Sequence, residues 1–200
     1  MSSNARIQGM SVQQRRERER ADRRRLIVQT ARELAEAEGW GAVTTRRLSE
    51  LVQYSQPVLY SHFKGKAAIV AAVAVEGITD LAADLRAARE EAADDVGALR
   101  GIARAYLDFA AEHPAAYDAM FVQPIDVTFG TGESPQALRD AFQEFMTALR
   151  PFAGERDPET FAELGWSWLH GLAMLTKGER LRPEHAESRL GLLVDALSRG

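Results

Sequence analysis

The side chains with the clearest chemistry lie between residues 45 and 66. Gln56 can pair with the N6 and N7 edge of adenine, and Pro57 and Val58 can make apolar contact with a thymine methyl group. Hydroxyl and ammonium groups that suit phosphate oxygens lie around them: Thr45, Tyr60 and Lys66. Side chains of these types fit the major groove of DNA. The alternative, a solvated helical hairpin whose polar face has no partner, stays open at this point.

Two short helices and a tight turn are needed to position this set. Apolar spacing predicts one helix from Thr44 or Thr45 to about Val52, and a second that starts at Ser55 and ends at Gly65. Two apolar residues four positions apart point inward from the second helix: Leu59 and Phe63. The polar positions of the second helix therefore face outward, and the whole unit is predicted to be a helix-turn-helix.

The run from Thr44 to Lys66 resembles the DNA-binding segment of the TetR (tetracycline-repressor) family. The positions that carry the resemblance are Thr44-Thr45, Leu59-Tyr60, His62-Phe63 and Lys66, and the version Gln56 to His62 is similar to that of the tetracycline repressor itself. The family usually has Gly in the turn, where this chain has Gln53-Tyr54. Either a differently shaped turn or a Tyr54 that packs or touches DNA would follow.

The resemblance implies a role for each matched residue. It places four side chains near the bases: Arg46, Gln56, Pro57 and Val58. It places four others on the DNA backbone: Thr45, Tyr60, His62 and Lys66. These eight residues are the expected DNA-binding site.

The composition favours an all-α protein. The 200-residue chain is rich in Ala, Leu, Arg and Glu, and it has no cysteine, which excludes disulfides and thiolate chemistry. No apolar run approaches the roughly 20 residues that a membrane span needs, and the polar N-terminus has no signal-peptide core. We therefore expect a cytoplasmic location and no membrane partner.

The charge is divided unevenly along the chain. Residues 1–70 hold 13 Lys and Arg against 7 Asp and Glu, a balance of +6, while residues 71–200 hold 12 against 22, a balance of −10. A basic end attracts the phosphate backbone by releasing counterions, and an acidic remainder is repelled by it. The division supports a separate N-terminal DNA-binding domain.

Three segments are expected in chain order: a disordered basic arm over residues 1–20, a three-helix helix-turn-helix domain over 21–66, and a helical ligand-binding and dimerisation domain over 67–200. Residues 11–25 carry 7 Arg against 3 acidic residues. Such a run is either a solvated face or an arm that reaches a groove or the phosphates, and both interpretations stay open. A helix from Leu26 to Gly39 should cover the inward faces of the two short helices, with Trp40 in the core.

The C-terminal domain is predicted to be a series of helices. A long helix from Lys66 to about Ala92 should connect it to the DNA-binding domain as a lever, and residues 122–134 have the composition of a flap. The last two helices, over 157–177 and 184–198, are the expected dimerisation pair. Two glycines in the first of these suggest the close approach of another helix: Gly165 and Gly171. Residues 168–171 also resemble the Trp-His-Gly signature of one C-terminal subclass of the family.

The domain from residue 67 onward holds 11 of the 15 aromatic residues, which can form an ordinary core or line an apolar cavity. The candidate ligand-binding residues are Tyr106, Phe109, His113, Tyr117, Phe121, Phe145, Trp168 and His170. No spacing indicates a metal site or a cofactor, and no catalytic signature indicates an enzyme.

The sequence predicts a ligand-responsive transcriptional regulator that represses by binding operator DNA as a homodimer. A small apolar or aromatic effector is expected to release it. The alternative is a helical scaffold or adaptor whose basic end binds polyanions.

Overall fold

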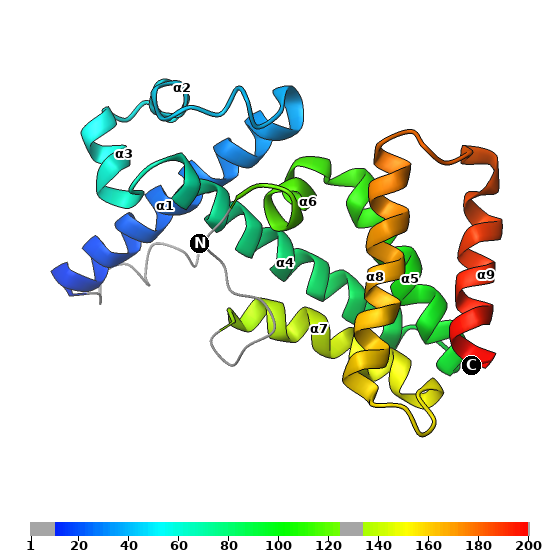
Figure 1. Ribbon diagram of the computed structural model, residues 1–200. Coiled ribbons are helices and arrows are strands. Elements are labelled where there is room, and N and C mark those ends of the chain that lie inside the picture. Colours follow the sequence, from blue (N-terminus) through cyan, green and yellow to red (C-terminus); the bar gives the residue numbers. More distant parts are fainter. Residues whose placement is uncertain (1–10, 125–133, 200) are drawn as a thin grey trace, which may run out of the picture. The chain divides into compact units, whose positions relative to one another are not determined.

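The computed structural model describes residues 11–124 and 134–199, which form helices joined by turns and include no strand. The all-α prediction is confirmed. The chain divides into two compact units, residues 1–73 and 74–200 (Figure 1). The two units divide between residues 73 and 74, inside one long helix. The sequence analysis placed the boundary earlier, at Lys66.

The first unit contains α1 (Val12–Glu38), α2 (Thr45–Leu51), α3 (Gln56–His62) and the first turns of α4 (Lys66–Glu90). Helix α1 begins early because Ser11 and Gln14 form a reciprocal capping box: the Ser11 hydroxyl accepts from the Gln14 N–H at 3.2 Å, and the Gln14 side chain accepts from the Ser11 N–H at 2.9 Å. The expectation of disorder is therefore wrong for residues 12–20. Residues 1–10 of the expected arm lie outside the described residues.

The core of the first unit has the predicted composition. Leu59 and Phe63 are buried, and Trp40 closes the core as expected. Other buried residues come from α1, α2, α4 and the connection between α1 and α2: Ile27, Leu34, Val43, Leu48 and Ile69. Arg47 also ties α2 to α1, because its guanidinium donates two hydrogen bonds to the carboxylate of Glu38, one of them at 2.7 Å.

The turn between α2 and α3 has a residue other than glycine in the left-handed region: Gln53 has φ = 56°, a conformation that favours glycine. At the other end of α2, Thr44 caps the helix by accepting from the Arg47 N–H at 3.1 Å. Tyr54 is half-buried, and its N–H donates to the Ser49 carbonyl at 3.0 Å. Ser55 occupies the N-cap position of α3, although its side chain makes no capping hydrogen bond.

The second unit contains the rest of α4, α5 (Asp95–Glu112), α6 (Pro114–Phe121), α7 (Gln136–Leu149), η1 (Arg150–Phe152), α8 (Pro158–Lys177), η2 (Pro183–His185) and α9 (Ala186–Arg199). Side-chain caps start two of these helices: Asp94 accepts from the Gly97 N–H at 2.7 Å, and Asp157 accepts from the Thr160 N–H at 2.8 Å. Helix α5 packs against α7, α8 and α9.

One of the two predicted helix approaches is present. A Cβ atom on Gly165 of α8 would lie 2.7 Å from Leu149 Cδ1, so the glycine permits close packing against the end of α7. A Cβ on Gly171 would meet nothing within 4 Å. Most of the predicted flap, residues 125–133, lies outside the described residues. Within the described ranges, no helix is long and apolar enough to cross a membrane.

Candidate functional site

Helix α3 exposes a polar face, and its opposite face is buried in the core of the first unit. Gln56 and Pro57 are exposed, Val58 is half-buried, and Tyr60 is 51% exposed. Leu59, on the opposite face of the same helix, is fully buried. The core therefore holds the helix while its outer residues remain accessible to a partner.

Two of the residues expected on the DNA backbone lie together. The hydroxyl oxygens of Thr45 on α2 and Tyr60 on α3 are 3.4 Å apart, so the two helices present adjacent hydroxyl groups. Lys66 is half-buried, and its ammonium group donates to the Trp40 carbonyl, which anchors the start of α4. Arg46 is exposed and pairs with Glu50 at 3.1 Å, a surface ion pair of small energetic weight.

A group of three arginines on α1 flanks the end of α3. A hollow of about 250 Å³ is lined by Arg16, Glu19, Arg20, Arg23, Ser61 and His62. We refer to Arg16, Arg20 and Arg23 as the arginine cluster. The guanidinium of Arg20 donates to the Ser61 carbonyl at 3.4 Å, so α1 is tied to the last turn of α3.

The next arginine along α1 strengthens this attachment. Arg24 donates to the His62 carbonyl at 3.3 Å, and its guanidinium carbon lies 4.3 Å from the centre of the Phe63 ring. The carbonyl groups at the C-terminus of a helix carry partial negative charge, which favours cations in this place. The run that was predicted as part of a disordered arm is therefore a folded edge of the first unit.

His62 reports the positive field of this edge. Burial lowers the pKa of His62, and the nearby charges of Arg20, Arg23 and Arg24 lower it further. Of the described residues that line the hollow, Glu19 is the one carboxylate, against the three guanidinium groups of the arginine cluster. The edge is thus suited to an anion such as a phosphate group.

The second unit brings five of the eight candidate ligand residues together. Tyr106 and Tyr117 are fully buried, and their rings meet edge to face with centroids 5.9 Å apart. The Phe145 ring lies 5.7 Å from that of Tyr106, and the His170 ring stacks on Tyr117 at 5.8 Å. Phe121 completes this group, at 4.8 Å from Tyr117.

The other three candidates lie elsewhere. Phe109 and His113 form a separate edge-to-face pair with centroids 5.1 Å apart. Trp168 is 41% exposed, whereas Trp166 contacts His170 at a centroid distance of 6.2 Å. The reason is helical geometry, because residues 166 and 170 are four apart and share a face, while residue 168 points to the other side. Trp166 is therefore the residue that the sequence analysis missed.

An open cavity adjoins this aromatic group. It measures about 490 Å³ and is lined by Met120, Phe121, Gln123, Pro124, Trp166, Ser167 and His170. Aromatic walls with a few polar groups are the usual form of a small-molecule site.

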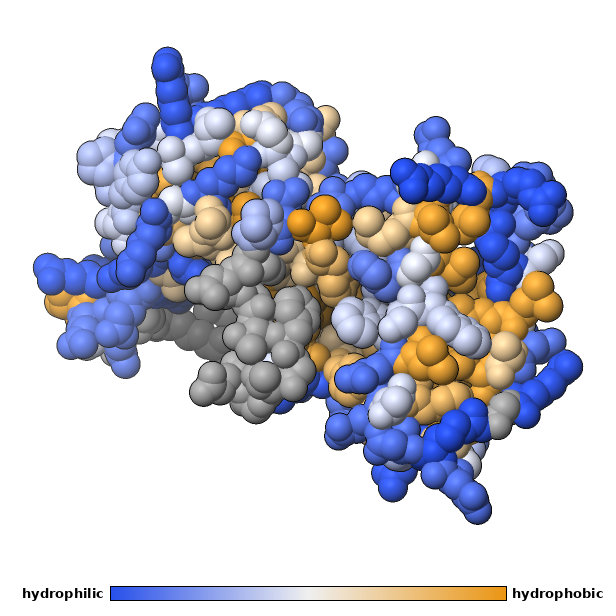
Figure 2. All heavy atoms as spheres, viewed as in Figure 1, coloured by the Kyte–Doolittle hydropathy of each residue, from blue (hydrophilic) through white to orange (hydrophobic). Residues whose placement is uncertain are grey.

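The last two helices expose an apolar surface. Leu164, Trp168 and Leu175 follow one another on α8 with exposed fractions above 40%, and Leu192 on α9 is 69% exposed. Figure 2 shows apolar residues gathered on the surface over α8 and α9. A patch of this kind on a protein surface commonly marks an interaction site.

Two family models match the chain. The model of bacterial regulatory proteins of the tetR family matches residues 27–73, and the model of the tetracyclin repressor-like C-terminal domain matches residues 99–197. The first match covers α2, α3 and the second half of α1 but begins after the arginine cluster, and the second covers the aromatic group and the exposed apolar surface.

Individual proteins give the same picture. The chain is 36% identical over 102 residues to the HTH-type transcriptional regulator YobS of Bacillus subtilis (strain 168), an alignment that covers 51% of this chain and 53% of that protein. The chain thus spans about half the length of the curated relative it matches.

Solved structures share the fold over most of their length. A protein of unknown function from Rhodococcus sp. RHA1 has a TM-score of 0.73 at 22% identity, covering 88% of this chain and 94% of that chain. BioQ, crystallised with its double-stranded DNA operator, has a TM-score of 0.64 at 23% identity, covering 88% and 98%. At these identities the likeness shows the fold alone.

Proposed function

Because this chain belongs to the TetR family of transcriptional regulators, we propose that it represses transcription as a homodimer on operator DNA and is released by a small apolar or aromatic effector. The observation that carries the proposal is the exposed face of α3 above a buried core. Gln56 and Pro57 are exposed on the surface of the first unit, as contact with base edges in a major groove requires. A cytoplasmic location goes with this role.

The arginine cluster extends the proposed DNA contact beyond α3. Its guanidinium groups stand beside the end of the reading helix, where they can meet phosphates that flank the bases which α3 reads. Tyr60 and Thr45 supply hydroxyl groups to the backbone from the other part of the face. In this proposal α1 fixes the register of the first unit on the duplex, and α3 reads the sequence.

The exposed surface of α8 and α9 supports a homodimer. A single helix-turn-helix reads only a few base pairs, and two copies about 34 Å apart on DNA supply specific affinity. Leu164, Trp168 and Leu175 repeat at helical spacing, and the open side of Gly171 lies between them in the sequence. A second copy of these helices would bury the stripe in a four-helix interface.

The cavity beside His170 is the proposed effector site. An effector changes DNA binding only by its difference in affinity between the DNA-competent conformation and the other one. Helix α4 runs without a break through the point at which the two units divide, so we propose that it transmits the change.

The test is selection of bound duplexes from a random pool with the purified full-length protein, followed by titration of the selected duplex. Gln56→Ala should lose discrimination at one or two base positions, at a cost of roughly tenfold in affinity for the selected site. Gln29→Ala is the matched control, because Gln29 is an exposed glutamine of α1 that bonds to Glu33. The same sample should be a dimer by light scattering.

Two results would contradict the proposal. Equal recovery of random and selected duplexes would favour the alternative of an adaptor with a polyanion-binding end. Equal losses in Gln56→Ala and Gln29→Ala would show that the α3 face does not read bases.

A further inference from the structure

The cavity of the second unit contains one polar group whose hydrogen-bonding role is fixed by its neighbours. Phe121 and Trp166 form apolar walls of this cavity, and their ring centroids lie 5.2 Å and 6.2 Å from that of His170. Ser167 already donates its hydroxyl to the Glu163 carbonyl at 2.7 Å. The Gln123 amide can both donate and accept, so it sets no preference. The polar selectivity of the cavity therefore depends on His170.

A chain of hydrogen bonds connects His170 to three buried or half-buried groups. The Trp166 indole Nε1–H lies 3.1 Å from the Tyr106 hydroxyl oxygen, which is 2.9 Å from the Tyr117 hydroxyl oxygen. That oxygen is in turn 2.7 Å from His170 Nδ1. An indole nitrogen can only donate, so the first bond has a fixed direction. Tyr106 must accept from Trp166.

The direction of the remaining bonds follows from the number of hydrogens. Tyr106 has one hydroxyl hydrogen, which can go to Tyr117, and Tyr117 then donates its own hydrogen to His170 Nδ1. In the reverse order Nδ1 would donate to Tyr117 and Tyr117 to Tyr106. The Tyr106 hydrogen would then have no acceptor among the described residues, and an unpaired buried hydroxyl is destabilising. The forward order satisfies every group.

His170 is consequently a neutral imidazole with its hydrogen on the other nitrogen. Burial lowers the pKa of His170, which favours the uncharged ring at neutral pH. Because Nδ1 accepts from Tyr117, the neutral ring carries its hydrogen on Nε2. Nδ1 faces the buried tyrosines, and Nε2 projects from the other side of the ring. Among the described residues no hydrogen bond uses Nε2.

We infer, on the basis of the ligand response proposed for this chain, that the effector is an aromatic or apolar molecule with an oxygen that accepts a hydrogen bond from His170 Nε2–H. A ketone, an ester or an ether oxygen beside a ring meets this requirement. A molecule whose only polar group is a donor does not, because it would place a hydrogen against Nε2–H and could not pair with His170.

The first measurement is the tautomer of His170 in the full-length, ligand-free protein, from ¹⁵N NMR of the imidazole. The expected result is a hydrogen on Nε2 and an unprotonated, hydrogen-bonded Nδ1 at neutral pH. Tyr117→Phe should remove the shorter of the two contacts at Nδ1, at 2.7 Å, and shift that resonance, while the Tyr106 hydroxyl remains 3.4 Å from the same nitrogen. A hydrogen on Nδ1 in the unmodified protein would overturn the inference.

The second measurement compares three bicyclic probes of similar size by chemical-shift titration to millimolar concentration: indane, which has no polar group, 1-indanone, an acceptor, and indole, a donor. We expect 1-indanone to bind about tenfold more tightly than indane, and indole to gain nothing over indane. His170→Phe should abolish the advantage of 1-indanone. Ser167→Ala, which changes the same cavity, should retain it.

The outcomes separate this inference from the proposed function. An advantage for indole, no binding of any probe, or an unchanged preference in His170→Phe would overturn the assignment of the site. Acceptor-selective binding that leaves the affinity for the selected duplex unchanged would instead contradict the ligand response, while the hydrogen-bonding role of His170 would stand.

Discussion

The arginine cluster of the first unit differs from a pair of arginines in the second. In the first unit Arg16, Arg20 and Arg23 gather around a hollow, and among the described residues that line it Glu19 is the one carboxylate. In the second unit two arginines of α4 converge on one carboxylate of α7. Glu144 is only 5% exposed, and it accepts from Arg86 Nε at 3.0 Å and from Arg89 Nε at 2.7 Å.

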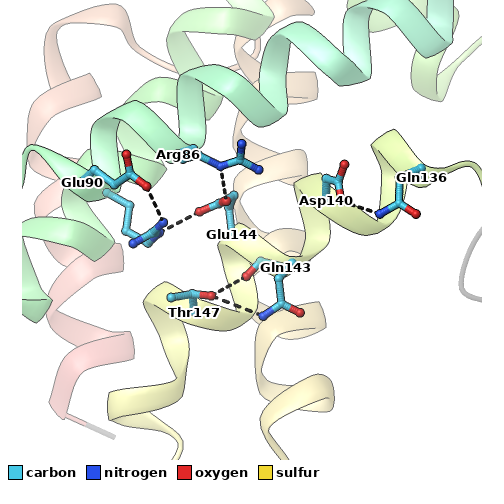
Figure 3. A network of polar contacts seen from close by, with 8 residues as sticks. Arg86, Glu90, Gln136, Asp140, Gln143, Glu144 and Thr147 are labelled. Atoms are coloured by element: carbon cyan, nitrogen blue, oxygen red, sulfur yellow. Dashed lines mark hydrogen bonds and ion pairs between the residues drawn. The ribbon is translucent and has the colours of Figure 1, made fainter.

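Figure 3 shows how closely the second arrangement is matched. Glu144 lies between the guanidinium groups that α4 contributes, and Glu90 accepts from Arg89 at 3.2 Å on the outer side. Lys177 and Asp118 form another such pair, between α8 and α6. In these examples the charged side chains of the second unit pair with one another, as expected where charged groups hold helices together.

The contrast distinguishes arginines that stabilise the fold, such as Arg86 and Arg89, from the arginine cluster, whose charge we propose serves binding. Like charges that gather on a folded surface repel one another, and after burial, which is the main cause, the positive charges of Arg20, Arg23 and Arg24 also lower the pKa of His62. The first unit keeps this unfavourable arrangement of guanidinium groups. An anionic partner such as DNA would neutralise the cluster and recover the lost free energy.

The largest effect should come from removing the arginine cluster. Replacing Arg16, Arg20 and Arg23 with Gln should weaken duplex binding at low salt by roughly 100-fold, and it should lower the salt dependence by about 3 units of the log–log slope. Fluorescence anisotropy over a salt series measures both. Thermal unfolding should change little, because these side chains are exposed.

A matched triple variant on the other face of α1 controls for net charge. Arg15, Arg18 and Arg25 lie on the side of the helix away from the cluster, so their replacement with Gln removes the same charge at a different place. We expect a much smaller loss of affinity. Equal losses in the two triple variants would mean that only the total charge matters, and that the cluster is no phosphate site.

The second effect concerns the paired charge of the second unit. Glu144→Gln should lower the free energy of unfolding by about 2 kcal/mol, because a neutral amide with one acceptor oxygen replaces the partly buried carboxylate that Arg86 and Arg89 share. Urea titration followed by circular dichroism is the measurement. The exposed Glu90→Gln is the control, with an expected change below about 0.5 kcal/mol.

The contrast would fail if Glu144→Gln altered the salt dependence of duplex binding as strongly as the arginine variants do. In that case charge in the two units would serve the same purpose.

A third and smaller effect compares two tyrosine hydroxyls. Tyr117→Phe should cost about 1 kcal/mol of stability, because it removes the bond to His170 from a fully buried position, and it should leave duplex binding unchanged. Tyr60→Phe should show the reverse: no loss of stability, and a loss of about threefold in duplex affinity. Unfolding and anisotropy on both variants decide. A stability loss in Tyr60→Phe would show that its hydroxyl supports the fold.

The sequence predicted what short spacing determines. Leu59 and Phe63 are four residues apart, so their burial follows from the geometry of one helix, and most helix limits follow from capping residues and prolines. The contact of Arg20 with Ser61 joins residues 41 apart, and that of Tyr117 with His170 joins residues 53 apart. No local pattern encodes such contacts. The start of α1 did have a local signal, the Ser11-x-x-Gln14 capping box, which the prediction of a disordered arm overlooked.

The choice between Trp166 and Trp168 shows the same limit at close range. Both lie on one helix, and the candidate list named Trp168, yet the structure places Trp166 against His170. Helical periodicity predicts that the two tryptophans point to different sides of α8. Which side lines the cavity depends on how α8 packs against other helices. The spacing of four between residues 166 and 170 was the available signal.

The smallest effect is a pH dependence of duplex binding, which His62 of the first unit should produce. In the free protein, burial and Arg20, Arg23 and Arg24 lower the pKa of His62; Arg16 and Glu19 also face the same hollow. Because the folded-state pKa of His62 is below the ordinary value, the contribution of neutral His62 to stability is fully present above about pH 6.5 and decreases as the pH falls below it.

Phosphates beside the cluster would raise the pKa of His62 again, so the complex with DNA should bind protons that the free protein does not. Duplex affinity should therefore increase by about threefold as the pH is lowered by one unit through this range. Anisotropy titrations between about pH 5.5 and pH 8 test this sign, and His62→Gln is the variant that should be flat. The control is His185→Gln, a change at a half-buried histidine of η2, which should follow the unmodified protein. A pH dependence that survives in His62→Gln would assign the bound proton to another group and would remove His62 from the proposed phosphate contact.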